Sequence, residues 1–216
     1  MAEKEFTCEY KVLFPIGNKM RERALEIYNS IVNARNALES MHLTWDGSQW
    51  NALATKWNGT IEFFHAALDV LVKTVPETME SISIGYSLSD SGSAIGEITR
   101  ASYEPLAVLP MGVETNLTLS NGDASTEREY QDEVDKFFRQ AKESLDEMKT
   151  ILDGTKDCGV WEGKAAEDSR NNFNNTYNLI STDIEAIKEA VKKNINEAIA
   201  EIQAGDQRAI ENANNL

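Results

Sequence analysis

Residues that could carry out chemistry are few in this chain, and their spacing does not assemble a reactive site. The two histidines, His42 and His65, and the two cysteines, Cys8 and Cys158, lack the short spacing of zinc ligands. The sequence contains no phosphate-binding loop, no dinucleotide-binding glycine pattern and no Gly-x-Ser-x-Gly motif. Most of the 36 acidic side chains are expected on solvated helix faces. We therefore expect no catalytic residues, no metal site and no cofactor, and we predict that the protein is not an enzyme.

Charge and hydropathy narrow the range of partners. The 216 residues carry a formal net charge of −15, which repels nucleic-acid phosphates and anionic lipid surfaces. The charged first five residues do not resemble a signal peptide, and no stretch approaches the roughly eighteen apolar residues of a membrane span. We expect a soluble protein with no nucleic-acid partner and no membrane insertion. If the protein is exported, we expect it to use no ordinary cleaved signal peptide.

Helical periodicity dominates two long parts of the sequence. Apolar residues recur every three or four positions after Asn18, again from Trp50, and in two further runs after Thr126 and from Phe173. Pro76 predicts a kink or a break in the second run, because proline lacks a backbone donor and clashes with the preceding turn. The predicted organisation is an N-terminal arm at 1–17, a first helical hairpin at 18–85, a linker at 86–125, a second helical hairpin at 126–205 and a flexible tail at 206–216.

The arm and the linker differ in composition from the hairpins. Residues 6–14 are rich in aromatic and β-branched types, so we predict a short strand or extended arm, with a disordered terminus as the alternative. In the linker, β-forming residues at 103–108 and 113–119 flank a plausible turn at 110–112. We therefore predict a small β-hairpin in the linker, which the arm could join.

An internal repeat relates the two hairpins. The tripeptide Trp45-Asp46-Gly47 returns as Trp161-Glu162-Gly163, and the same shift of 116 residues aligns Trp57-Asn58-Gly59-Thr60-Ile61 with Phe173-Asn174-Asn175-Thr176-Tyr177. Apolar positions further along the helices fall in the same register. We interpret the sequence as a tandem duplication.

Each Trp-x-Gly tripeptide is predicted to form the corner of its hairpin. A corner must reverse the chain within a few residues, and Gly47 and Gly163 tolerate backbone angles that a Cβ forbids. The indoles of Trp45 and Trp161 are large enough to cover the end of the hairpin and to bury roughly 150–250 Å² each. These four residues are the predicted hairpin-turn motif.

A helix, a Trp-x-Gly corner and a second helix form a pattern that resembles the WXG superfamily, the early-secreted-antigen-like substrates of bacterial type VII secretion. The resemblance covers roughly residues 18–90 and 126–206, and it occurs twice. It implies an all-α fold in which the two hairpins pack as an antiparallel four-helix bundle, an intramolecular pseudo-dimer. It also implies a protein that is secreted or displayed at the cell surface without a cleaved signal peptide, and that is cytoplasmic before export.

The resemblance further implies an export signal and a set of partners. Family members often carry Tyr-x-x-x-Asp/Glu just after the second helix, and Tyr86 and Asp90 match this pattern here. The equivalent positions of the second hairpin are Ile202 and Asp206, so only one copy of the signal is expected. The implied partners are the ATPase of the secretion apparatus, and a toxin or a second WXG-type protein that the chain would accompany. The alternative is a helical structural or adaptor protein that is not exported by this route.

The bundle that the resemblance implies requires a linker of a minimum length. Its two corners lie at opposite ends, so the linker must run the length of a twenty-five-residue helix, about 37 Å, which needs roughly twelve extended residues. Residues 86–125 are sufficient. The same geometry brings Cys8 close to Cys158, and we predict that a disulfide between them is possible in an exported protein.

Overall fold

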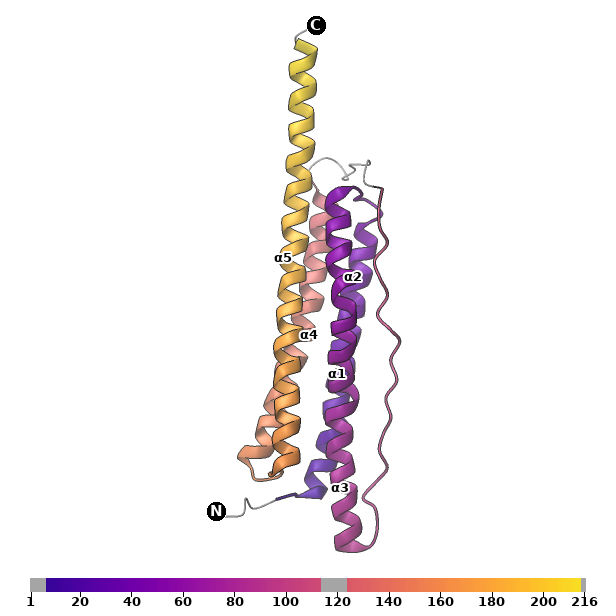
Figure 1. Ribbon diagram of the computed structural model, residues 1–216, viewed down its shortest axis with the longest axis vertical. Coiled ribbons are helices and arrows are strands. Elements are labelled where there is room, and N and C mark those ends of the chain that lie inside the picture. Colours follow the sequence, from indigo (N-terminus) through magenta and orange to yellow (C-terminus); the bar gives the residue numbers. More distant parts are fainter. Residues whose placement is uncertain (1–6, 114–123, 215–216) are drawn as a thin grey trace. The chain divides into compact units, whose positions relative to one another are not determined.

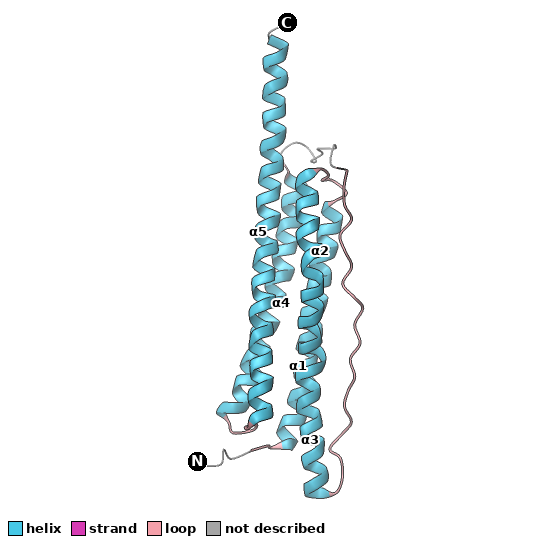
Figure 2. Ribbon diagram, in the orientation of Figure 1, coloured by secondary structure: helices cyan, strands magenta, loops and turns pink. Residues whose placement is uncertain are grey.

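The chain is all-α in the computed structural model, which describes residues 7–113 and 124–214 (Figures 1 and 2). Its helices are α1 (Tyr10–Met41), α2 (Ser48–Asp69), the π-helical turn η1 (Val70–Thr74), α3 (Val75–Ser91), α4 (Ser125–Asp157) and α5 (Lys164–Asn214). Among the described residues no strand forms, although an isolated antiparallel bridge joins Cys8 to Trp161 and Asp46 also occupies an isolated bridge position. Within the same residues, no helix combines the length and apolarity that crossing a membrane requires.

The contacts divide the chain into two compact units, and each unit draws on all the long helical runs. Unit 1 combines segments within 1–30, 63–105 and 140–181, and unit 2 combines segments within 31–62, 106–139 and 182–216. The corner between α1 and α2 therefore belongs to unit 2, and the corner between α4 and α5 belongs to unit 1.

Each unit has an apolar core, most of which comes from the predicted stripes, although Phe138 is buried in place of the predicted Phe137, and Leu13 and Met20 lie outside the predicted stripes. In unit 1 the fully buried side chains include Leu13, Met20, Ile27, Phe64, Leu68, Leu71, Leu145, Met148 and Phe173. In unit 2 they include Ile31, Leu38, Met41, Trp50, Leu53, Trp57, Val134, Phe138, Ile187 and Ile195. Complete burial of one aliphatic or phenyl side chain contributes about 1.5–3 kcal/mol of hydrophobic stabilisation. The helices are therefore stabilised mainly by tertiary packing, in addition to their intrinsic helix propensity.

The N-terminal arm that we predicted at 1–17 is wrong from Tyr10 onward, because α1 begins there and not near Asn18. The carbonyl of Glu9 accepts the N–H groups of Val12 and Leu13, both at 2.9 Å, which starts the helix. Pro15 lies inside α1 and removes one backbone hydrogen bond. The complete burial of Leu13 offsets this loss, so the helix persists through the proline. Residues 1–6 lie outside the described residues.

The interruption that Pro76 predicts appears as a π-helical turn and not as a break. The turn η1 directly precedes α3, and Pro76 occupies the first turn of α3, where its missing N–H costs least. The side chain of Thr74, the residue before α3, makes no capping hydrogen bond. Helix α3 then continues past the predicted end at residue 85 to Gly92, whose φ of 70° and N–H bond to the Leu88 carbonyl close it.

The linker has no regular secondary structure over residues 94–113. Its first predicted strand, residues 103–108, is not formed, and residues 114–119 of the second lie outside the described residues. The backbone is extended beside the helices (Figure 1). The β-hairpin is therefore not seen in the described part of the linker.

The predicted flexible tail is also corrected by the structure, because α5 continues past Gly205 to Asn214. A Cβ added at Gly205 would meet no atom within 4 Å, so this glycine serves no close packing contact. The alanine, glutamine and arginine residues that follow it favour helix, which explains why one glycine does not end α5.

Candidate functional site: the two corners and the linker

The two Trp-x-Gly corners have the same length and the same helix boundaries. Six residues separate the end of α1 at Met41 from the start of α2 at Ser48, and six separate the end of α4 at Asp157 from the start of α5 at Lys164. These boundaries differ by 116 in both cases, which is the shift that aligns the two tripeptides in the sequence.

The two glycines also adopt the same backbone conformation. Gly47 has a φ of 109° and Gly163 a φ of 103°, in a region that L side chains rarely adopt. Each glycine carbonyl accepts an N–H from the first turn of the following helix, that of Asn51 or Glu167, at 3.0 Å. The positive φ angles account for glycine at both corners.

The two corner tryptophans are completely buried. Trp45 and Trp161 both have no exposed surface, as expected for indoles that cover the end of a hairpin. Within the described residues, neither indole N–H has a hydrogen-bond partner. The neighbours differ, because Trp45 lies edge-on to the Trp50 ring at 5.8 Å, whereas the guanidinium of Arg170 lies 5.8 Å from the Trp161 ring. The corners therefore share a buried indole and differ in what covers it.

The segment before α1 joins the second corner in unit 1. Cys8 pairs with Trp161 in the antiparallel bridge, and the N–H of Glu9 donates to the carbonyl of Val160 at 2.8 Å. The N–H of Glu162 donates to the carbonyl of Thr7 at 2.9 Å. The N-terminal segment is thus fixed against one corner.

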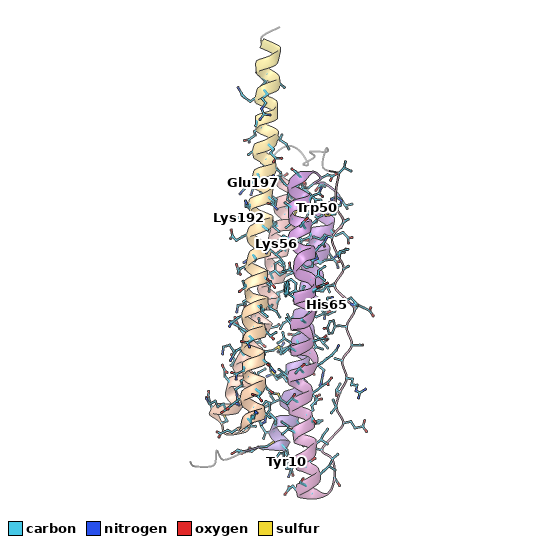
Figure 3. All side chains as sticks on the ribbon, in the orientation of Figure 1. Tyr10, Trp50, Lys56, His65, Lys192 and Glu197 are labelled. Carbon is cyan, nitrogen blue, oxygen red and sulfur yellow. The ribbon has the colours of Figure 1, made fainter. Side chains whose placement is uncertain are left out.

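Tyr86 and Asp90 lie on one face of the last turns of α3, since they are four residues apart in a helix. The side chain of Tyr86 is 40% exposed. The Tyr10 hydroxyl donates to Asp90 Oδ2 at 2.6 Å, and this hydrogen bond raises the pKa of Tyr10 above its ordinary value. Tyr10 is labelled in Figure 3. The structure therefore links the predicted signal to the start of α1, a contact that the sequence did not indicate.

The predicted disulfide is not formed, because Cys8 and Cys158 are both free thiols. Cys8 is partly covered by its pairing with Trp161, whereas Cys158 is exposed. Burial raises the pKa of the Cys8 thiol to about 11. Both cysteines belong to unit 1.

In unit 2 the linker is held by four side chains of α2, which we call the Trp/Asn ladder: Trp50, Asn51, Trp57 and Asn58. The indole N–H of Trp57 donates to the carbonyl of Ala107 at 3.2 Å, and that of Trp50 donates to the carbonyl of Pro110 at 3.0 Å. Trp50 is labelled in Figure 3. The tryptophans of the ladder therefore bind linker carbonyls, unlike the corner tryptophans.

The asparagines of the Trp/Asn ladder each bind both polar groups of one linker residue. Asn58 accepts from the N–H of Leu109 at 2.8 Å and donates to its carbonyl at 3.0 Å. Asn51 makes the same pair with Gly112, at 2.7 and 3.2 Å. A Cβ on Gly112 would lie 1.8 Å from Oδ1 of Asp46, so only glycine fits at this position. Asp46 Oδ1 also accepts from the N–H of Val113 at 2.8 Å.

The distance between successive ladder residues along α2 is close to the distance between the linker residues that they bind. The ladder repeats after seven residues, which rise about 10.5 Å along a helix. The linker residues that it binds repeat after three, which span about 9–10 Å of extended chain. The sequence signal for this site was the dipeptide Trp-Asn at 50–51 and again at 57–58, which periodicity analysis treats only as core.

In unit 1 the linker also contacts the helices. The N–H of Thr99 donates to Glu80 Oε2 at 3.2 Å, and the Tyr103 hydroxyl donates to Asp69 Oδ1 at 2.8 Å. The Tyr103 ring stacks on His65, which is labelled in Figure 3. Burial together with the bond to Asp69 raises the pKa of Tyr103. His65 therefore has a packing role.

Glu80 also forms a buried ion pair with Arg21. The guanidinium donates to the two carboxylate oxygens at 2.5 and 2.7 Å, and the two side chains are 4% and 0% exposed. Gly17 leaves room for this pair, since an added Cβ would lie 3.1 Å from Glu80 Cγ. The ion pair ties α1 to α3 and, through Thr99, to the linker.

Within residues 7–113 and 124–214, no group of three or more His, Cys, Asp or Glu side chains could hold a metal ion. Comparison of this chain with family models, with curated proteins and with solved structures gave no match. The site is therefore interpreted from its own geometry.

Proposed function

We propose that this protein is a tandem WXG-type protein of a bacterial type VII secretion system, which acts through protein contacts. It is either exported itself or accompanies a toxin as its targeting chaperone. The observation that carries the proposal is the repetition of the corner, with a buried tryptophan, a glycine at positive φ and matching helix boundaries at a shift of 116 residues.

The architecture we propose is an intramolecular pseudo-dimer, an antiparallel four-helix bundle. Its support is the composition of the two units. Unit 2 contains the corner of the first hairpin with the start of α4 and the end of α5, and unit 1 contains the corner of the second hairpin with the start of α1 and the end of α3. An antiparallel pairing of hairpins would group the segments in this way.

The proposed export signal is Tyr86 with Asp90, and its proposed partner is the ATPase of the secretion apparatus. Helix α3 extends to Ser91, so the pattern lies on the last turns of a helix, and the exposed fraction of Tyr86 leaves part of its ring accessible to a partner. The proposed location is the cell surface or the medium, reached without cleavage of a signal.

The test is export of Tyr86→Ala and Asp90→Asn variants, measured as the ratio of protein in culture supernatant to protein in lysate. We expect both variants to remain in the lysate. Tyr10→Phe is the matched control, because it removes the hydrogen bond to Asp90 without changing the pattern itself. Unchanged export of both variants, or export that persists without the ATPase, would contradict the proposal.

The second candidate function is a helical adaptor that is not exported by this route. The hydrogen bond between Tyr10 and Asp90 favours it, because it gives Asp90 a structural task. In that case Asp90→Asn and Tyr10→Phe lower the unfolding midpoint together and have no effect on location.

A further inference from the structure

The Trp/Asn ladder binds the linker at positions that repeat every three residues. The carbonyls of Ala107 and Pro110 each accept an indole N–H, and Leu109 and Gly112 each pair with one asparagine through their N–H and carbonyl groups. All six of these hydrogen bonds go to backbone atoms of the linker. The ladder therefore recognises the course of the linker backbone and not its polar side chains.

Burial in the bound segment follows the same period of three. Leu106 and Leu109 are 6% and 1% exposed, whereas Val108 and Met111 are 61% and 55% exposed. Side chains three residues apart point to opposite faces of a β-strand, but to the same face of a polyproline II helix, which has three residues per turn. Pro110 fixes a φ close to that of this helix. The segment 106–112 therefore has the periodicity of polyproline II.

A polyproline II helix makes no internal hydrogen bonds, so its backbone groups are available to a binding surface, and aromatic-lined grooves commonly bind such segments. The ladder offers two indoles and two amides, and Arg35 of α1 adds a bond to the carbonyl of Val108 at 2.8 Å. We propose that the Trp/Asn ladder is a recognition site for a polyproline II segment of a partner protein, with the pattern Leu-x-x-Leu-x-x-Gly, and that the linker occupies it as an intramolecular ligand which the partner displaces.

The pattern follows from the positions that face the helices. The nearly complete burial of Leu109 calls for an apolar side chain at this position. A Cβ on Gly112 would lie 1.8 Å from Oδ1 of Asp46 and 3.0 Å from Cδ1 of Trp50, so the last position requires glycine. The intervening residues contribute backbone atoms or point outward, and many side chains fit there. A segment from another protein with the same three residues would make the same contacts.

The hairpin framework does not itself require the ladder. A shift of 116 residues places Ala166 on Trp50 and Phe173 on Trp57, so the second hairpin forms the same corner without the two indole donors. The bound part of the linker has no regular secondary structure, and its release would break no helix. A tethered ligand acts at a millimolar effective concentration, so a partner segment binds weakly until the linker leaves. This inference does not rest on the proposed role in secretion.

The test is fluorescence anisotropy of the full chain with a labelled peptide of the natural sequence 104–113. A release variant, Leu109→Asp with Gly112→Val, changes two linker residues that contact the ladder and leaves the ladder itself intact. We expect the peptide to bind this variant at least tenfold more tightly than the unchanged chain, in which the linker competes. A peptide that carries the same two changes should bind the release variant at least tenfold more weakly than the natural peptide.

Changes in the ladder, made in the release variant, test the binding site directly. Asn51→Ala with Asn58→Ala should weaken binding of the natural peptide by at least tenfold, since four hydrogen bonds are lost. Thr55→Ala, an exposed change on α2 outside the ladder, is the matched control and should leave the affinity unchanged. Gly112→Ala alone is a milder release variant, because the added methyl group meets Asp46, and it should rank the two peptides in the same order.

Three outcomes would overturn the inference. One is no binding of the natural peptide to a release variant that thermal unfolding shows to be folded, or equal binding of the natural and changed peptides. Another is binding that the paired asparagine changes leave intact. The third is dimerisation of the unchanged chain that increases with concentration and is lost in the release variant. That result would assign the ladder to the linker of a second copy of this chain and not to a partner protein.

Discussion

The two hairpins share their framework and differ in the surface that it presents. Their helix boundaries repeat at a shift of 116 residues, and both corners bury a tryptophan before a glycine at positive φ. On the first hairpin the Trp/Asn ladder binds the linker, whereas the equivalent face of the second hairpin carries two carboxylates, Glu162 and Glu167, next to Arg170. The corner is therefore the common architectural element, and the helix face next to it is where the two hairpins differ.

The largest expected effect concerns the buried ion pair, which the second hairpin lacks. Arg21 and Glu80 correspond to Phe137 and Asn196. Glu80→Ala leaves the guanidinium buried without its partner and should lower the free energy of unfolding by about 3–5 kcal/mol. Urea denaturation of the full chain measures this.

Two further variants sharpen this comparison. Asn196→Ala should change stability by less than about 0.5 kcal/mol, because its side chain is exposed. Arg21→Met combined with Glu80→Leu should recover most of the loss, since an apolar pair of similar volume needs no charge partner. A loss below about 1 kcal/mol for Glu80→Ala would show that the pair is accessible to water.

The helices and the corners were accessible to sequence reasoning, because both leave local signals. Apolar spacing predicted the buried stripes through Ile31, Leu38 and Met41, and the repeated tripeptide predicted both corners. Helix ends were predicted less well. At Pro15, tertiary burial of the neighbouring Leu13 maintains a helix that proline disfavours locally, and Gly85 lies within α3 without ending it.

The hydrogen bonds that hold the linker could not be predicted from local sequence patterns. They join Asn51 and Asn58 to residues more than fifty positions away, and the bound groups are backbone atoms, which have no residue signature. The Tyr10 bond to Asp90, across eighty positions, is of the same kind. Such contacts depend on where the elements meet in space, which periodicity does not specify.

A medium effect should distinguish the linker-binding face of the first hairpin from the equivalent face of the second. Asn58→Ala removes both bonds to Leu109 and should cost about 1–3 kcal/mol. It should also increase the rate of hydrogen exchange at the Leu109 N–H, measured by NMR. Asn174→Ala, the matched change in the second hairpin, should cost less than about 0.5 kcal/mol in the free protein. Equal costs would mean that both faces are already occupied within the chain.

The corner glycines should respond alike, because they share their conformation. Gly47→Ala and Gly163→Ala should each cost about 1–2 kcal/mol, the strain of an L side chain at positive φ. Gly154→Ala is the control with the opposite sign, since this glycine lies inside α4 with no atom within 4 Å of an added Cβ. It should stabilise the protein by about 0.5–1 kcal/mol. Thermal unfolding of the three variants makes the comparison, and unequal losses at the two corners would contradict their equivalence.

The smallest effect is kinetic and tests the contact between Cys8 and the second corner. Cys8 pairs with Trp161 in the bridge, and its pKa is raised to about 11 from 9.0 because it is partly buried. At pH 8 its thiolate fraction should be about a hundredfold lower than that of an unperturbed thiol, so iodoacetamide should modify it far more slowly than the exposed Cys158. Since the raised pKa delays ionisation, the Cys8 rate should keep increasing as the pH rises through 9 and 10, which mass spectrometry of quenched samples can follow. Equal rates for the two cysteines at pH 8 would mean that the N-terminal segment is not held against the second corner.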